Sequence, residues 1–182
     1  LCGDTDTRVI VYLREQAHAI ASTYQEEVKT GSLAESFSAV VESSLRQARF
    51  SMWNYAALLK DWREAFGANQ VVIREYHGQN IVSDFLSAAD TGSDGMDVSR
   101  PPDPNITIAG ALLEVKRRLN ETIAGEGAEL QALVEGHMQA MARANPKYRG
   151  RPCADPSLIA AIRETFRPLN AAIGVTFTET PW

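Results

Sequence analysis

The stretch Arg8-Val9-Ile10-Val11-Tyr12-Leu13-Arg14 decides the fold class of this 182-residue chain. Its centre is a short β-branched run without polar alternation, which is typical of a strand buried on both faces of a parallel sheet. A helical pattern follows at once, from Glu15 to about Lys29, and Gly31 occupies the position at which a helix commonly ends. A strand that turns directly into a helix predicts the first part of an α/β fold.

Further elements follow in the order of a parallel sheet with crossover helices. Residues 32–49 are weakly patterned and predict a helix-rich excursion, and residues 52–66 predict an amphipathic helix closed by Gly67. A second β-branched run, 70–76, predicts a strand, and residues 81–89 predict a helix. We expect the two strands to be parallel neighbours in one sheet, with Arg14 at a carboxyl end.

The second half of the chain has the pattern of a helical region. Residues 91–104 contain three Pro and two Gly and predict a loop or hinge. Helical apolar spacing then predicts helices over 108–123, 128–142 and 156–173. Asp155-Pro156 is a good start signal for the last of these, and Pro168 should kink or shorten it. We expect one domain over 1–182, with a strand and helix portion at 1–90 and a helical portion at 105–182.

Composition excludes several classes of protein. With 45% hydrophobic and 23% charged residues, the chain has the composition of a soluble globular protein, and no apolar run approaches the roughly 20 residues that a membrane span needs. The net charge of −5 argues against a broad nucleic-acid surface, so any anion site must be local. Two cysteines are too few for a disulfide framework. Since no signal peptide is visible, we expect a cytoplasmic protein without membrane or nucleic-acid partners.

Arg14 is the residue that most directly suggests a ligand. Ligands of parallel sheets bind at the carboxyl ends of strands, and an arginine there offers a fork of donors matched to phosphate. Ser22 lies about two helical turns further on, where its hydroxyl could face the same anion. An arginine after a buried strand is also commonly solvated or ion-paired, and a helical serine usually has no special role. From spacing alone, both interpretations stay open.

Residues 8–24, Arg8-Val-Ile-Val-Tyr-Leu-Arg14-Glu-Gln-Ala-His-Ala-Ile-Ala-Ser22-Thr-Tyr24, resemble the 3′-phosphate-binding motif of sulfotransferases. Similar segments follow in order at 55–67, 71–76 and 82–86. The resemblance is strongest to bacterial polysaccharide-modifying enzymes. It implies a P-loop-like parallel sheet with flanking helices, and Arg14 and Ser22 on the 3′-phosphate of 3′-phosphoadenosine 5′-phosphosulfate. The implied reaction moves a sulfuryl group to a hydroxyl, here of a carbohydrate.

A fainter similarity covers residues 148–174. Tyr148-Arg149-Gly150-Arg151-Pro152, and later Phe166-Arg167-Pro168-x-Asn170, resemble the C-terminal region of heparan-type sulfotransferases. In that family a Lys-Gly-Arg loop wraps the nucleotide phosphates, which implies that Arg149, Gly150 and Arg151 belong to the cofactor site. Arg149 stands where the family pattern has Lys. The alternative is a solvated basic turn before a capped helix.

The chain also departs from the family. The loop that holds the 5′-phosphosulfate should precede Arg8, and no such segment is present, so we expect a chain whose beginning has been removed. A catalytic base cannot be assigned, because His18, His77 and His137 are not at its expected place. No histidine pair has metal-ligand spacing, so no metal is expected. The chain alone should therefore bind the donor weakly and catalyse little. The alternative is a non-catalytic helical interaction or nucleotide-binding module.

Other residues are expected to serve structure. An isolated sheet without its first strand and helix would leave an unpaired edge, so we expect marginal stability or self-association into a homo-oligomer. Aromatic residues at helical spacing predict core packing, and charged residues along the helices predict solvated surfaces. The aromatic residues are Trp53, Trp62 and Phe66, and the charged ones are Glu26, Glu27, Lys29, Glu114, Lys116, Arg117 and Arg118.

Overall fold

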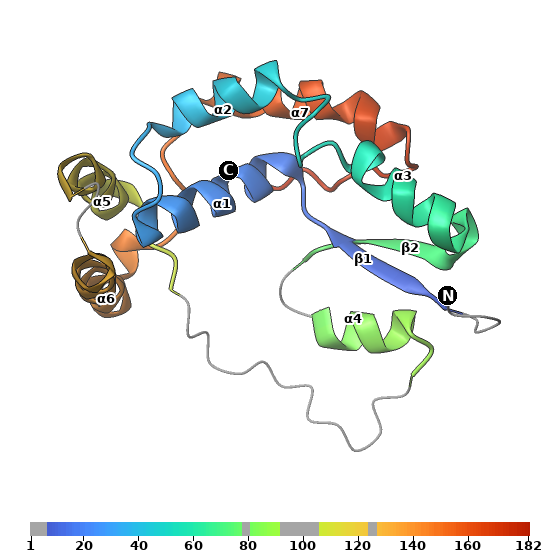
Figure 1. Cartoon of the computed structure of the whole chain (residues 1–182), viewed down its shortest axis with the longest axis horizontal. Helices are drawn as coiled ribbons and strands as arrows, with labels where there is room; N and C mark the ends of the chain where they lie inside the picture. Colours follow the sequence, from blue (N-terminus) through green and yellow to red (C-terminus); the bar gives the residue numbers. More distant parts are fainter. Residues whose placement is uncertain (1–6, 78–80, 92–105, 124–126) are drawn as a thin grey trace. The chain divides into compact units, whose positions relative to one another are not determined.

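A computed structural model describes residues 7–77, 81–91, 106–123 and 127–182 of the chain (Figure 1). The described residues form a mixed α/β protein, mostly helical, with a small two-stranded parallel sheet. They divide into two compact units. The sheet unit draws on Leu1–Glu15, Ala48–Pro102 and Phe166–Glu179, and the helical unit on Gln16–Gln47, Asp103–Thr165 and Thr180–Trp182. The predicted loop at 91–104 lies almost entirely outside the described residues.

The sheet unit contains the two strands that the sequence predicts. β1 (Val9–Leu13) pairs in parallel with β2 (Val71–Glu75), in a register that runs from Val9 opposite Val71 to Leu13 opposite Glu75. The predicted parallel pairing is therefore confirmed. The expectation of burial on both faces is wrong, since only Leu13 and Val71 are buried. Two strands alone, as described, leave each strand with an edge that no described strand covers.

One face of this sheet forms the core of the unit. Alternate residues of β1 point to the same face, and that face packs against α3 (Tyr55–Phe66) and the segment after α7. The ring of Phe177 meets Tyr55 edge-on at 6.1 Å. The cluster consists of Val9, Val11, Leu13, Tyr55, Ala56, Leu59, Val71, Ile73, Ile173, Val175 and Phe177.

The opposite face of the sheet meets α4 (Ile81–Ala88) through polar contacts. Tyr12 and Arg74 lie opposite each other in the register. Both bind Asp84 of α4. The Tyr12 hydroxyl donates to Oδ2 at 2.6 Å, and the Arg74 guanidinium donates to both carboxylate oxygens. No residue of α4 itself is buried. Hydrogen bonds and ion pairs, more than apolar burial, therefore attach this helix.

The helix predicted over 52–66 is α3, which begins at Tyr55 after the cap residue Asn54 and has its buried residues in its first half. The Asn54 side chain accepts a hydrogen bond from the amide of Ala57, and the short 3-10 turn Ala68–Gln70 follows the helix. Leu59 is buried, whereas Trp62 and Phe66 are 46% and 39% exposed and stack on each other at 5.8 Å. The prediction that these two aromatic residues belong to the core is wrong, because both side chains are exposed.

The helical unit is built around α1, the helix that follows Arg14 and Glu15. Its apolar residues recur at the spacing of one helical face, and they pack against α2, α5 and α6. The buried apolar residues of α1 are Ala17, Ile20, Ala21, Tyr24 and Val28. The helices and one 3-10 turn of this unit are α1 (Gln16–Thr30), α2 (Phe37–Arg46), α5 (Gly110–Ile123), α6 (Ala128–Ala144), η2 (Pro146–Tyr148) and, up to Thr165, α7 (Pro156–Ala171).

A buried polar cluster lies between α5, α6 and the end of α1. Lys116 is fully buried, and its Nζ donates to Asn120 Oδ1 at 2.5 Å and to Gln131 Oε1 at 3.0 Å. The prediction that Lys116 lies on a charged surface is therefore wrong. Lys29 is buried as well, with its ammonium 2.5 Å from the carboxylate of Glu26. Amphipathic stems allow such residues to occupy core positions when their heads find partners.

Helix α7 confirms its predicted start at Pro156 and ends at Ala171, two residues before the predicted end. The Asp155 carboxylate accepts hydrogen bonds from the amide and the hydroxyl of Ser157. Pro168 lies inside the helix, which continues to Ala171. Pro168 has no backbone N–H to donate to the Glu164 carbonyl, four residues earlier. Both residues are exposed, so water can bind that carbonyl.

Among the described helices, none has the length and apolar character needed to cross a membrane.

Candidate anion-binding site

Arg14 lies at the carboxyl end of β1, beside the residue that follows β2. Leu13 and Glu75 form the last strand pair, and the amide of Tyr76 donates to the Leu13 carbonyl at 2.8 Å. Arg14 and Tyr76 therefore leave the sheet side by side. The guanidinium carbon of Arg14 lies over the Tyr76 ring, 4.4 Å from its centroid. This distance is well within the range of a cation–π interaction.

The backbone of Arg14 is fixed from the core. Its carbonyl accepts a hydrogen bond of 2.7 Å from the hydroxyl of Tyr55, the first residue of α3. Tyr55 is 6% exposed, and burial raises the pKa of its hydroxyl to about 12, so this donor stays protonated at physiological pH. The strand end, the helix start and the side chain of Arg14 are thus held as one local structure.

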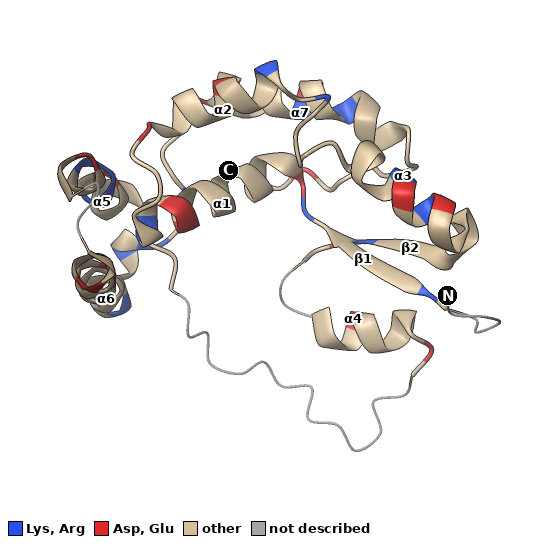
Figure 2. Cartoon of the chain, in the orientation of Figure 1, with Lys and Arg blue, Asp and Glu red and all other residues tan. Residues whose placement is uncertain are grey.

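Among the described residues, no carboxylate forms an ion pair with Arg14. Arg8, at the other end of β1, pairs with Asp90 at 2.5 Å, and Arg74 pairs with Asp84. By contrast, Arg14 makes no ion pair with any residue that the structure describes. Figure 2 shows acidic and basic residues interspersed along α3 in the same unit. Within the described residues, Arg14 is therefore a stacked arginine without an ion pair, and the acidic residues nearest to it in the strand pair are Glu15 and Glu75.

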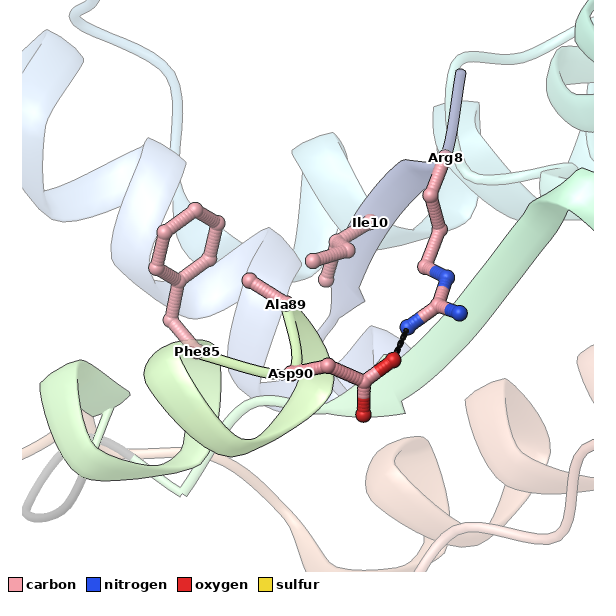
Figure 3. Close-up of a pocket in the computed structure, with 5 residues that line it drawn as sticks. All are labelled: Arg8, Ile10, Phe85, Ala89 and Asp90. Carbon is pink, nitrogen blue, oxygen red and sulfur yellow. Dashed lines mark hydrogen bonds and ion pairs between the residues drawn. The ribbon is translucent and has the colours of Figure 1, made fainter. Parts of the chain in front are cut away.

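A hollow of about 470 Å³ lies at the other end of β1, against α4 (Figure 3). Its described lining includes Ile10, Phe85 and Ala89, with Arg8 and Asp90 on one side. Figure 3 shows the Arg8 guanidinium turned towards Asp90, to which it donates, and Arg8 also donates to the Ala88 carbonyl at 2.9 Å. Because the two charges offset each other, this hollow is a poorer anion site than the Arg14 end.

Ser22, the predicted partner of Arg14, lies on the exposed side of α1. It belongs to the helical unit, whereas Arg14 belongs to the sheet unit. Exposure leaves the hydroxyl accessible to a ligand. The joint binding of one phosphate by Arg14 and Ser22 stays a prediction.

The loop Arg149–Arg151 follows η2 in the helical unit. The Arg149 guanidinium donates to the carbonyls of Ala142 and Arg143 at 2.7 and 2.6 Å, which satisfies acceptors at the C-terminal end of α6. The Gly150 carbonyl accepts from Gln25 at 2.8 Å. Arg151 donates to the Pro181 carbonyl, and its guanidinium carbon lies 5.6 Å from the Trp182 ring centroid. The role of this loop in binding the nucleotide stays a prediction. In the structure, the two arginine side chains donate to backbone carbonyls of the helical unit.

The three histidines have contacts with neighbouring side chains or backbone. His18 Nε2 lies 2.6 Å from the Thr180 hydroxyl, and its ring stacks on Trp182. His77 is exposed and 3.6 Å from Glu75, and the Nδ1 of His137 is 2.8 Å from the backbone of its own helix. Within the described ranges, no group of three His, Cys, Asp or Glu side chains is placed to hold a metal ion.

Tyr76 is the site residue that the sequence analysis did not single out. The two β-branched runs pair flush, with Val9 opposite Val71. Extending this register by one residue beyond Leu13 brings Arg14 beside Tyr76. Aligning the two predicted strands end to end would therefore have placed Tyr76 next to Arg14.

Comparisons of this chain with protein-family models, with curated proteins and with solved structures find no match.

Proposed function

We propose that this chain is a sulfotransferase-like protein whose Arg14 and Ser22 bind the 3′-phosphate of 3′-phosphoadenosine 5′-phosphosulfate. One observation carries the proposal. Arg14 stands at the carboxyl end of a parallel strand, stacked on an aromatic ring and without a carboxylate partner among the described residues. An arginine so placed supports a phosphate site, because ligands of parallel sheets collect at this edge.

The chemistry of the site suits a phosphate. A guanidinium presents its donors in a planar fork that matches two phosphate oxygens, and hydrogen bonds to a charged group are about twice as strong as neutral ones. In sulfuryl transfer, Arg14 and Ser22 would bind and orient the donor nucleotide. A carbohydrate hydroxyl is the proposed acceptor, on the resemblance to polysaccharide-modifying enzymes alone. We assign no residue to the proton transfer.

Titration calorimetry on the full chain tests the proposal. Adenosine 3′,5′-bisphosphate should bind better than adenosine 5′-monophosphate, which lacks the group that Arg14 is proposed to hold. Since a hydrogen bond to a charged group contributes about 1.5–3 kcal/mol, Arg14→Ala should weaken bisphosphate binding by about one to two orders of magnitude. Arg14→Lys should recover part of the loss, and Ser22→Ala should cost less than Arg14→Ala.

The matched control is Arg8→Ala, at the amino end of the same strand, where the guanidinium pairs with Asp90. This variant should keep the preference for the bisphosphate. Equal losses for both nucleotides in Arg14→Ala would show that Arg14 supports the fold and not the 3′-phosphate. No preference in the unchanged chain would refute the proposal itself.

A non-catalytic interaction module is the second candidate, and one observation favours it. Leu58, Trp62 and Phe66 recur every four residues along α3 and are 49%, 46% and 39% exposed. Such a stripe is a common feature of protein-binding helices. If this function is correct, light scattering should show association that Trp62→Glu abolishes, and neither nucleotide should bind preferentially.

A further inference from the structure

We infer that Tyr76 is a positioning residue for this anion site: its ring holds the Arg14 guanidinium in place and leaves the guanidinium's charge available to the ligand. The inference rests on the proposed function, because it assumes that Arg14 binds the 3′-phosphate. It adds the residue that directly follows β2, in direct contact with the proposed anion-binding group.

The backbone fixes both partners before any ligand arrives. Tyr76 is tied to β1 by its amide, which donates to the Leu13 carbonyl at 2.8 Å. Arg14 is tied to α3 by its carbonyl, which accepts from Tyr55. The remaining freedom lies in the side-chain torsions of Arg14, and a long arginine loses much rotamer entropy when a ligand fixes it. Stacking on Tyr76 restricts that freedom in advance, which favours binding.

An aromatic partner, unlike a carboxylate, leaves the N–H donors of the guanidinium available to a ligand. The N–H donors of a guanidinium lie in its plane, whereas a ring below it interacts with its face. Arg74 and Arg8 show the alternative, since their carboxylate partners occupy donors and offset the charge. Tyr76 orients Arg14 without competing with a phosphate for the same hydrogen bonds.

Four substitutions at Tyr76 separate the effect of the aromatic ring from the effects of the hydroxyl, of apolar bulk and of charge. Tyr76→Phe keeps the π face and removes only the hydroxyl. Tyr76→Leu removes the π face and stays apolar, and Tyr76→Thr is a second ring-free variant suited to a strand end, should the leucine variant fold poorly. Tyr76→Glu replaces the ring by a carboxylate that would pair with Arg14.

The experiment is calorimetric titration of each variant of the full chain with adenosine 3′,5′-bisphosphate and with adenosine 5′-monophosphate. Tyr76→Phe should keep the preference for the bisphosphate, and Tyr76→Leu or Tyr76→Thr should lower it about 3- to 10-fold. Tyr76→Glu should lower it further. Combining Tyr76→Leu with Arg14→Ala should add little to the loss caused by Arg14→Ala alone, because the ring acts through the guanidinium.

A spectroscopic readout tests the stacking without any nucleotide. The Arg14 Nε–H proton should resonate upfield in the unchanged chain and in Tyr76→Phe, and lose that shift in Tyr76→Leu. If the unchanged chain has no preference for the bisphosphate, the proposed function fails and this inference fails with it. If Arg14→Ala abolishes the preference and the ring-free variants keep it, the inference alone is overturned. Equal weakening of both nucleotides by Tyr76→Leu would also overturn it.

Discussion

The ammonium of Lys116 lies 2.5 Å from the side-chain oxygen of Asn120, and both side chains are almost wholly out of contact with solvent, at 0% and 2% exposure. The amide nitrogen of Asn120 donates in turn to the carbonyls of Val28 and Leu33, at 2.8 and 2.7 Å. Gln131 of α6 accepts from the same ammonium. This buried cluster therefore links the end of α1 with α5 and α6.

Asn120→Ala should destabilise the chain strongly. The change removes one bond to a buried carbonyl and one to a partly buried carbonyl, and it leaves the buried ammonium with one acceptor fewer. Unsatisfied buried polar groups cost about 1–3 kcal/mol each, so a total loss of about 2–4 kcal/mol is expected in urea unfolding. Asn69→Ala, at an exposed position of the turn after α3, should change the unfolding free energy little. Similar values for the two variants would contradict the importance of the cluster.

Gly31→Ala should destabilise the same region by a different route. Gly31 has a φ of 90°, and a Cβ there would come within 2.4 Å of the Gln131 side-chain oxygen. A left-handed alanine costs about 1–3 kcal/mol, and Gln131 would also have to move from Lys116. Gly136→Ala is the matched change: it lies inside α6 with nothing near the new Cβ and should stabilise by about 0.5–1 kcal/mol. If thermal melts showed that both substitutions shift the midpoint temperature in the same direction, this explanation would be refuted.

Asp84→Asn should weaken the attachment of α4 in a pH-dependent way. Hydrogen bonds from Arg74 and Tyr12 lower the pKa of the Asp84 carboxyl from 3.8 to about 2. A carboxyl whose pKa is lowered by folding stabilises the fold above its unfolded pKa and loses that effect as pH falls through the folded value. At pH 7 we expect the midpoint temperature to fall by about 2–4 °C.

The difference between Asp84→Asn and the unchanged chain should shrink as the pH is lowered from about 4 towards 2. Circular-dichroism melts across this range provide the measurement. Asp61→Asn, on the exposed side of α3, serves as the control and should leave the midpoint nearly constant at every pH. A difference that stays the same from pH 7 to pH 2 would show that the carboxylate charge does not hold α4.

Arg149→Ala should reduce stability more than nucleotide preference. Its guanidinium binds two carbonyls at the end of α6, so its loss should cost about 1 kcal/mol in urea unfolding. The ratio of affinities for the bisphosphate and the monophosphate should stay close to that of the unchanged chain. If that ratio collapses while stability is retained, Arg149 binds phosphate, as the resemblance to heparan-type enzymes implies.

The features predicted correctly from the sequence are those that local patterns determine. The β-branched runs, the glycine after α1 and the Asp155-Pro156 start each act within a few residues. The errors concern burial, which depends on partners distant in the sequence. Nothing around Lys116 predicts that Asn120 and Gln131 would enclose it, and the apolar spacing around Trp62 does not predict that this side chain would be exposed.

The alternation of β1 also limits how this segment can change in length. Its odd-numbered residues enter the core with Tyr55 and Leu59. On the opposite face, Tyr12 binds Asp84 within α4, and Arg8, just before the strand, binds Asp90 after α4. Inserting or deleting one residue in the middle of the strand would turn every side chain beyond that point to the other face. Arg14 would then leave the Tyr76 ring. Homologous chains should accordingly vary in sequence along β1 but keep its length, or change it by two residues at a time.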